Sequence, residues 1–96
     1  MTLKHQQTFE AVLDEMSSVR ADKCGQYGET RYEHPEPDFN RWMCFSDVHR
    51  KYIRAEHQTK QRAPSAALRE TYLDLANYAA MAVQLIDMGR FDEPKN

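Results

Sequence analysis

Residues 68–83 read LRETYLDLANYAAMAV, the pattern of a helix that is apolar almost all round, and this helix decides the fold. At 3.6 residues per turn, Glu70, Asp74 and Asn77 share one face of it, and apolar side chains cover most of the remaining circumference. A helix of this kind is expected to be buried. Because buried carboxylates are costly unless they are paired, hydrogen-bonded or bound to a metal, the polar face needs partners in the chain or in a second subunit.

Two further helical patterns precede this one. The first runs from about residue 3 to 23, and a loop over 25–37 with two glycines and two prolines near its ends separates it from the second, at about 39–61. The third runs over about 64–88, with Pro64 in its first turn and Gly89 at its end. Asp38 or Asn40 is expected to cap the second helix, and the tail over 91–96 to be frayed. The side chains expected to face inward are Phe9, Val12, Leu13, Met16 and Val19 in the first helix, and Trp42, Phe45, Val48 or His49, Tyr52 and Ile53 in the second.

The chain is therefore predicted to be a single all-α domain over 1–96, a three-helix antiparallel bundle. A domain of 96 residues buries only about 60–65% of the surface that its unfolded chain exposes. Few partners within the chain are large enough to cover so apolar a third helix. We therefore expect a homo-oligomer to complete the bundle.

Charge and composition exclude several classes of function. With 13 basic and 15 acidic side chains, the formal charge of -2 gives no extended surface for nucleic acid or an anionic membrane. The sequence has no apolar run of 18 residues and no signal-peptide pattern, so we expect a cytoplasmic protein. Cys24 and Cys44 fit no zinc motif and are expected to be free, reduced thiols. The four histidines show no metal-ligand spacing either, and no nucleophile or P-loop motif occurs, so no catalytic residue is assigned.

The polar face of the third helix has two interpretations. Glu70 and Asp74, four residues apart, present oxygens to one point and would suit Mg²⁺, which needs only one or two carboxylates beside phosphate oxygens and water. In the structural interpretation, Asp74 instead forms an ion pair with Arg54 or Lys51 across the bundle.

The second helix carries Asp47, Lys51 and Arg54 on one face, at i, i+4 and i+7. Asp47 and Lys51 would make an ordinary ion pair within the helix, with Arg54 in solvent. Alternatively, Lys51 and Arg54 hold phosphate while Asp47 orients them or joins the metal ligands. Lys23 and Tyr27, at the end of the first helix, form another small group, in which Tyr27 stacks on a base or plugs the end of the bundle.

Three motifs together resemble the nucleotide modification associated domain 1 family, which is found largely in phages and prophages. They are Lys23-x-x-x-Tyr27-Gly28, then Arg41-Trp42-x-x-Phe45-Ser46-Asp47-x-x-x-Lys51-x-x-Arg54, then Leu68-Arg69-Glu70-Thr71-x-x-Asp74-Leu75-Ala76-Asn77-Tyr78-Ala79. The resemblance covers roughly residues 20–86. Gln26 and Glu70 stand where the family usually has Asp.

The resemblance implies a link to nucleotides, and the helices are also similar to all-α nucleoside triphosphate pyrophosphohydrolases of the MazG type. Those enzymes bind magnesium through acidic helices and usually carry a Glu-x-x-Glu pair on an earlier helix. The nearest equivalents in this chain are Glu10, Asp14 and Glu15.

We therefore expect a small phage-type protein of the host cytoplasm that binds a nucleotide or nucleotide-derived ligand. The assigned residues are Asp47, Glu70 and Asp74 for Mg²⁺, Lys23, Lys51 and Arg54 for phosphate, and Tyr27, Asn77 and Tyr78 for the base or sugar. Three functions fit these residues: magnesium-dependent nucleotide hydrolysis, sequestration of a nucleotide signal of host defence without hydrolysis, and a protein-binding helical module with no ligand.

Overall fold

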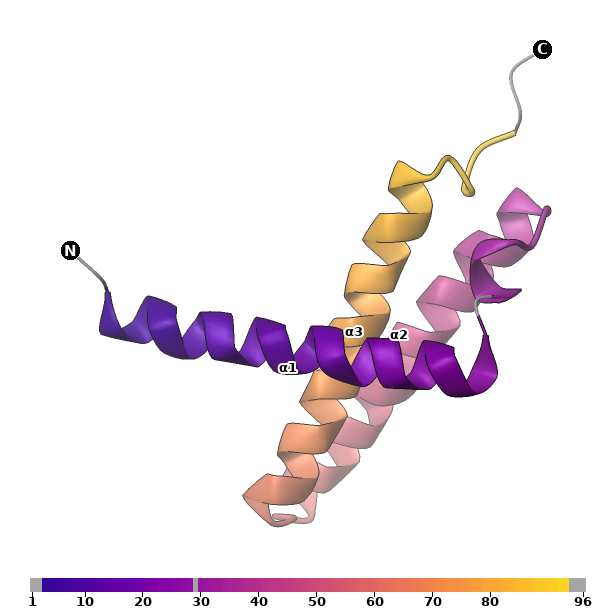
Figure 1. Ribbon diagram of the computed structural model, residues 1–96. Coiled ribbons are helices and arrows are strands. Elements are labelled where there is room, and N and C mark those ends of the chain that lie inside the picture. Colours follow the sequence, from indigo (N-terminus) through magenta and orange to yellow (C-terminus); the bar gives the residue numbers. More distant parts are fainter. Residues whose placement is uncertain (1–2, 29, 94–96) are drawn as a thin grey trace.

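The computed structural model describes residues 3–28 and 30–93, with the side chain of Tyr27 outside the description. Within these residues the chain forms α1 (Lys4–Tyr27), the short 3-10 turn η1 (Thr30–Tyr32), α2 (Pro37–Lys60) and α3 (Ser65–Asp87), and no strand (Figure 1). The prediction of an all-α chain with three helices is confirmed. Both ends of each helix lie within four residues of their predicted positions.

The helices α2 and α3 pack against each other along their length and form an antiparallel hairpin, as Figure 1 shows. Its core lies near the open end of the hairpin, where Tyr32, Cys44 and Leu85 are buried. Met43, Met81 and Phe91 pack around these three side chains. The burial of Leu85, which has no accessible surface, anchors the end of α3 against the start of α2.

Both helices of the hairpin end in a Schellman motif. After α3, the N–H of Gly89 donates to the carbonyl of Ile86 and that of Arg90 donates to Leu85, with Gly89 at a φ of 75° as predicted for a closing glycine. The same pair of hydrogen bonds follows α2, but there the residue with positive φ is Arg62, at 52°. A side chain in this conformation carries a steric cost that glycine does not have.

Asn40 ties the two ends of the hairpin to the rest of the chain. Its side-chain N–H groups donate to the carbonyls of His34 and Arg90, and the residue is 1% exposed. The predicted cap on α2 is therefore wrong, since Asn40 lies inside the helix and Glu36 stands at the cap without a side-chain hydrogen bond. The predicted fraying is also wrong at Phe91, whose carbonyl accepts a hydrogen bond from Arg41, and residues 94–96 lie outside the description.

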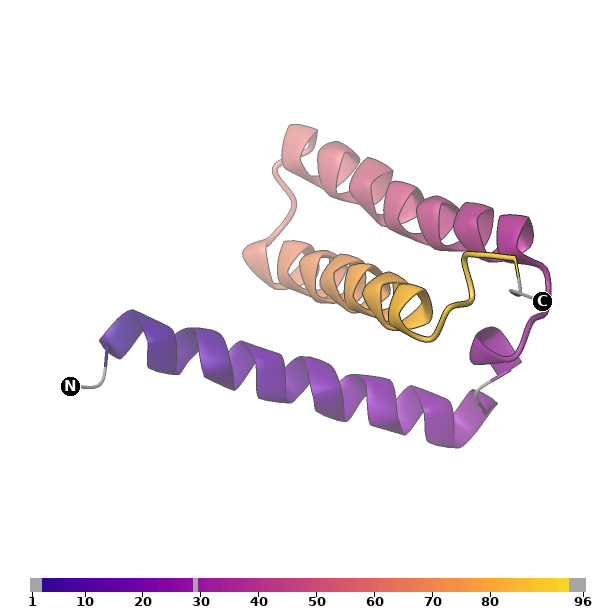
Figure 2. The ribbon, with the colours of Figure 1, turned by 90° about the horizontal axis from the view of Figure 1, so that it is seen from above.

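The first helix crosses the hairpin instead of running alongside it (Figure 1), and α3 lies between α1 and α2 when the molecule is seen from above (Figure 2). Contacts with α3 lie near the middle of α1, at Glu15, and near its C-terminal end, at Lys23. The Glu15 carboxylate accepts two hydrogen bonds of 2.7 and 2.8 Å from the Arg69 guanidinium. The antiparallel arrangement thus holds for α2 and α3 alone.

The side chains predicted to face inward are largely exposed in the single chain. On α2, the face toward α3 is built from small and polar side chains such as Cys44 and Ala55, because these let the two helices approach closely. Further along α2 the exposed aromatic side chains contact one another: the ring of Trp42 meets that of Phe45 edge-on, and the ring of His49 stacks with those of Phe45 and Tyr52. On α3, Thr71 and Leu85 are the buried residues, so the expectation that this helix is enclosed fails for a single chain. The large exposed apolar side chains are Phe9, Val12 and Leu13 on α1, Phe39, Trp42, Phe45, Tyr52 and Ile53 on α2, and Tyr72, Val83 and Ile86 on α3.

Candidate functional site

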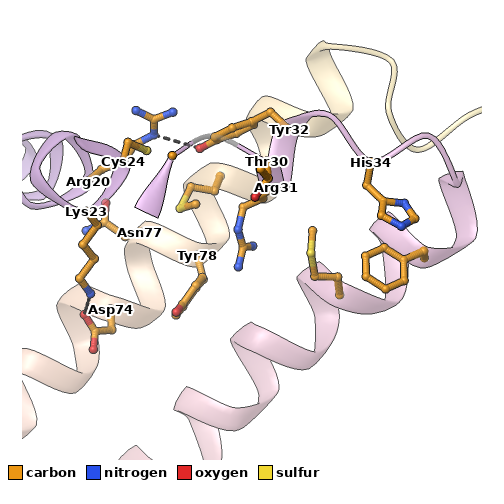
Figure 3. A pocket seen from close by; sticks show the side chains of 14 residues that line it. Arg20, Lys23, Cys24, Thr30, Arg31, Tyr32, His34, Asp74, Asn77 and Tyr78 are labelled. Atoms are coloured by element: carbon orange, nitrogen blue, oxygen red, sulfur yellow. Dashed lines mark hydrogen bonds and ion pairs between the residues drawn. The ribbon is translucent and has the colours of Figure 1, made fainter. Parts of the chain in front are cut away.

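A cavity of about 530 Å³ lies where the end of α1, the turn η1 and the two helices of the hairpin meet. Figure 3 shows side chains from all of these elements around it. Its lining residues are Arg20, Lys23, Cys24, Gly28, Thr30, Arg31, Tyr32, His34, Phe39, Met43, Asp74, Asn77, Tyr78 and Met81. The volume is in the range of about 300–1,000 Å³ that small-molecule sites occupy.

The charged side chains that line the cavity are mostly cationic. Among the described lining residues, Arg20, Lys23 and Arg31 are cationic, and Asp74 is the one carboxylate. The side chain of Lys23 is 57% exposed, and its ammonium lies 3.6 Å from Asp74 (Figure 3). Arg20 donates a hydrogen bond of 3.0 Å to the hydroxyl of Tyr32. The local charge therefore favours an anion, although the chain as a whole is acidic.

Asp47 holds Arg31 at the edge of the cavity. The Arg31 guanidinium donates a 2.6 Å hydrogen bond to one carboxylate oxygen of Asp47, and Arg50 donates to the other at 3.1 Å. Both guanidinium groups lie within 6 Å of the centre of the Tyr78 ring, at 5.2 and 5.7 Å. Nη1 of Arg31 is buried and has no hydrogen-bond partner in the described part of the chain. A ligand atom that accepts a hydrogen bond would satisfy this donor.

Asp74 joins all three helices of the chain. The ammonium of Lys51 on α2 lies 3.2 Å from one carboxylate oxygen of Asp74, and the ammonium of Lys23 on α1 lies 3.6 Å from the other. The predicted ion pair between Asp74 and Lys51 is confirmed. The predicted pair within α2, between Asp47 and Lys51, is wrong, because Asp47 pairs with Arg31 and Arg50 while Lys51 is 14% exposed and turns toward α3.

The structure brings together part of the predicted site. Four of the predicted residues line the cavity: Lys23, Asp74, Asn77 and Tyr78. Lys51 and Asp47 contact residues of the cavity without lining it, whereas Glu70 and Arg54 are exposed on their helices. The predicted role of Tyr27 falls on a side chain outside the described residues.

The three carboxylates predicted to hold Mg²⁺ do not converge on one point. In the described part of the chain, no three His, Cys, Asp or Glu side chains are grouped closely enough to hold a metal ion. Asp47 and Asp74 each have two cationic partners, and Glu70 does not line the cavity. In this arrangement an incoming cation would first have to displace lysine or arginine from Asp47 or Asp74, and the magnesium site stays a prediction.

The end of the cavity away from Lys23 is apolar and aromatic. The rings of His34 and Phe39 stack with centroids 4.0 Å apart, and Figure 3 shows the labelled His34 at this end. Met43 and Met81 add apolar surface to the lining of the cavity. The cavity thus presents charge at one end and a surface for a planar apolar group at the other.

The two cysteines are free, as predicted, and differ in their surroundings. Cys24 is partly exposed and lines the cavity. Burial raises the pKa of the Cys44 thiol, so this thiol is expected to be unreactive.

The residues of the site that sequence reasoning missed include four that carry polar side-chain groups: Arg20, Arg31, Tyr32 and His34. Arg20 precedes Lys23 by three residues, so helical spacing would have placed both cations on one face of α1. The other three belong to the connection between α1 and α2, where no periodicity indicates which side chains point inward. Their position depends on η1 folding back over the hairpin.

Comparison of the chain with protein-family models, curated proteins and solved structures gives no significant match. The resemblance found in the sequence motifs therefore stays a prediction. Among the helices of the described residues, none combines the length and apolar character that crossing a membrane requires.

Proposed function

We propose that this protein binds a phosphorylated nucleotide or nucleotide-derived ligand in the cavity and holds it without breaking a bond. The observation that carries the proposal is that the described lining residues include three cationic side chains and one carboxylate, that of Asp74. Guanidinium and ammonium groups are the side chains that bind phosphate most strongly, and arginine adds directional hydrogen bonds.

The proposed orientation follows from the two ends of the cavity. The phosphate lies near Lys23 and Arg31, where it accepts the unsatisfied hydrogen bond of Arg31 Nη1. The base or another planar group lies toward His34 and Phe39. Tyr78 already contacts two guanidinium groups, so its main role is to hold them in place.

Binding without hydrolysis is favoured over magnesium-dependent chemistry because Asp47 and Asp74 each already pair with two cationic side chains, which leaves a net positive charge among these six groups. Sequestration of a nucleotide signal is the use that requires an anion site and no metal. The resemblance to a largely phage family supports such a signal of host defence as the ligand.

Calorimetry and thermal melting with nucleoside monophosphates, nucleoside triphosphates and cyclic dinucleotides, each with Mg²⁺ and with EDTA, test the proposal. A ligand at about 100 times its Kd stabilises the fold by about 2.7 kcal/mol, which is readily detected. We expect selective stabilisation in EDTA and recovery of the intact ligand. Stabilisation by a triphosphate only with Mg²⁺, followed by pyrophosphate release, would replace the proposal with the hydrolase.

Matched lysine variants locate the site. Lys23→Gln removes a cation of the cavity, and Lys60→Gln removes a cation that is also exposed but lies at the far end of α2. We expect the first to weaken binding about tenfold, the effect of about 1.4 kcal/mol, and the second to leave it unchanged. Equal affinities in both variants would place the ligand elsewhere.

Cys24 provides an independent test of location, because its thiol lines the cavity. In a Cys44→Ser background, the bound ligand is expected to slow the reaction of Cys24 with a thiol reagent. Unchanged labelling under saturating ligand would contradict binding in this cavity.

A further inference from the structure

The first half of α1 buries no residue against the described part of its own chain. Every residue over 4–14 is exposed, including Phe9 at 57%, Leu13 at 44% and Val12 at 36%. Both views show this half of the helix extending beyond α3 (Figures 1 and 2). We call residues 4–14 the α1 arm.

The arm also lacks the local features that stabilise a helix by itself. Leu3 stands at the cap without a side-chain hydrogen bond, and the first turn contains no acidic residue. Isolated helices shorter than about 12–15 residues are marginal in water even with favourable sequences. The helical conformation of the arm therefore needs packing against another surface.

The accessible surface area of the chain is larger than expected for a compact monomer of its mass. A compact monomer of 11.3 kDa exposes about 5,700 Å², whereas this chain exposes 7552 Å². Its radius of gyration is 15.7 Å, compared with about 12.5 Å for a compact domain of this length. The excess surface is about 1,800 Å².

The size of this excess surface area indicates a permanent rather than a transient protein partner. A standard protein complex buries about 800 Å² per partner, and permanent oligomers bury about 1,000–2,500 Å² per subunit through more apolar interfaces. The surplus of the whole chain falls in the second class, and Phe9, Val12 and Leu13 are the apolar side chains that the arm contributes to this surface. A transient partner would leave the free chain with this surface uncovered.

We infer that the α1 arm is an interface between copies of this chain, and that a second copy covers Phe9, Val12 and Leu13. The inference is independent of the proposed ligand, because the lining of the cavity on α1 begins at Arg20. Packing of the arm on a second copy supplies the contacts that its helix lacks.

Sedimentation velocity and light scattering on the full chain, from nanomolar to high micromolar concentration, test this inference. We expect the mass of an oligomer, a whole-number multiple of 11.3 kDa that is at least twofold. The double variant Phe9→Glu and Leu13→Glu places charges in the arm and is expected to sediment as a monomer. The control is Val83→Glu on α3, where the native side chain is 56% exposed, and it should keep the wild-type mass.

Hydrogen exchange supplies a readout that does not depend on mass. Amides over 4–14 should be protected in the wild-type protein and lose protection in the double variant, while the hairpin remains protected in both. A wild-type protein that is monomeric at every concentration overturns the inference. So does an oligomer that survives the double variant or dissociates only in Val83→Glu, since its interface then excludes the arm.

Discussion

The ammonium of Lys51 on α2 lies 3.2 Å from the carboxylate of Asp74 on α3, and this pair connects the hairpin to the cavity. The side chains are only 14% and 29% exposed, so each depends on the other for compensation of its charge. Lys23 approaches the same carboxylate from α1. One carboxylate thereby holds together the elements that form the site.

Loss of the Asp74 charge should destabilise the hairpin. Asp74→Asn leaves the ammonium of Lys51 without its counter-charge and is expected to lower the free energy of unfolding by about 1–3 kcal/mol. Urea denaturation of Asp74→Asn, Lys51→Met and the double variant forms a double-mutant cycle. Additive losses would mean that the two side chains do not interact. Glu10→Gln, which removes an exposed carboxylate of α1, is the control and should leave stability unchanged.

The contact between α1 and α3 should weaken in acid. Hydrogen bonds from Arg69 lower the pKa of Glu15 below its usual 4.5. A carboxyl group with a lowered pKa in the folded state stabilises the fold above the unfolded pKa, and this contribution is lost as the pH falls through the folded pKa. Melting curves of the wild-type protein and Glu15→Gln should therefore differ at neutral pH and converge below about pH 4.5.

Asp14→Asn serves as the matched control for this pH dependence, because it removes the adjacent, exposed carboxylate of α1. Its melting temperature should follow that of the wild-type protein across the pH range. A gap between wild type and Glu15→Gln that persists in strong acid would show that the ionised pair with Arg69 is not its source.

The adjacent residues Leu85 and Ile86 should respond very differently to truncation. Leu85 has no accessible surface, so Leu85→Ala removes buried contacts and is expected to cost about 2–5 kcal/mol. Ile86 is 51% exposed, and Ile86→Ala should cost less than about 1 kcal/mol. Chemical denaturation of both variants compares them directly, and a larger loss for Ile86 would mean that α3 packs with its other face inward.

Arg62→Gly is expected to stabilise the protein. At a φ of 52°, the arginine at the end of α2 adopts a left-handed conformation that glycine adopts without a side-chain penalty. The gain should be about 0.5–1 kcal/mol after the larger entropy of glycine in the unfolded chain is subtracted. Arg62→Ala removes the same charge but keeps the Cβ atom, so it should give no gain. If the two variants had equal thermal stabilities, any change from the wild-type protein would be due to the loss of the arginine charge and not to the backbone conformation.

Local sequence patterns predicted the helices well because they depend on contacts between near neighbours. Apolar spacing located α1, α2 and α3, and Gly89 correctly marked the end of α3. The ion pair between Asp74 and Lys51 could also be predicted from the sequence, because both residues lie near the middle of helices that are expected to be neighbours. Periodicity alone, however, does not say which of two faces a helix buries. Apolar spacing therefore predicts that Trp42 and Phe45 face inward, whereas both are exposed in the structure.

The sequence by itself determined that the chain is all-α, where its helices lie, and which residue types were available to bind an anion. Only the tertiary structure decided which cations meet. Arg31 reaches Asp47 because η1 folds back over the hairpin, and Arg20 and Lys23 reach the cavity because α1 crosses α3. The physical reason is that helix formation depends on hydrogen bonds over four residues. The crossing of helices and the path of a connection depend on packing between segments far apart in the chain.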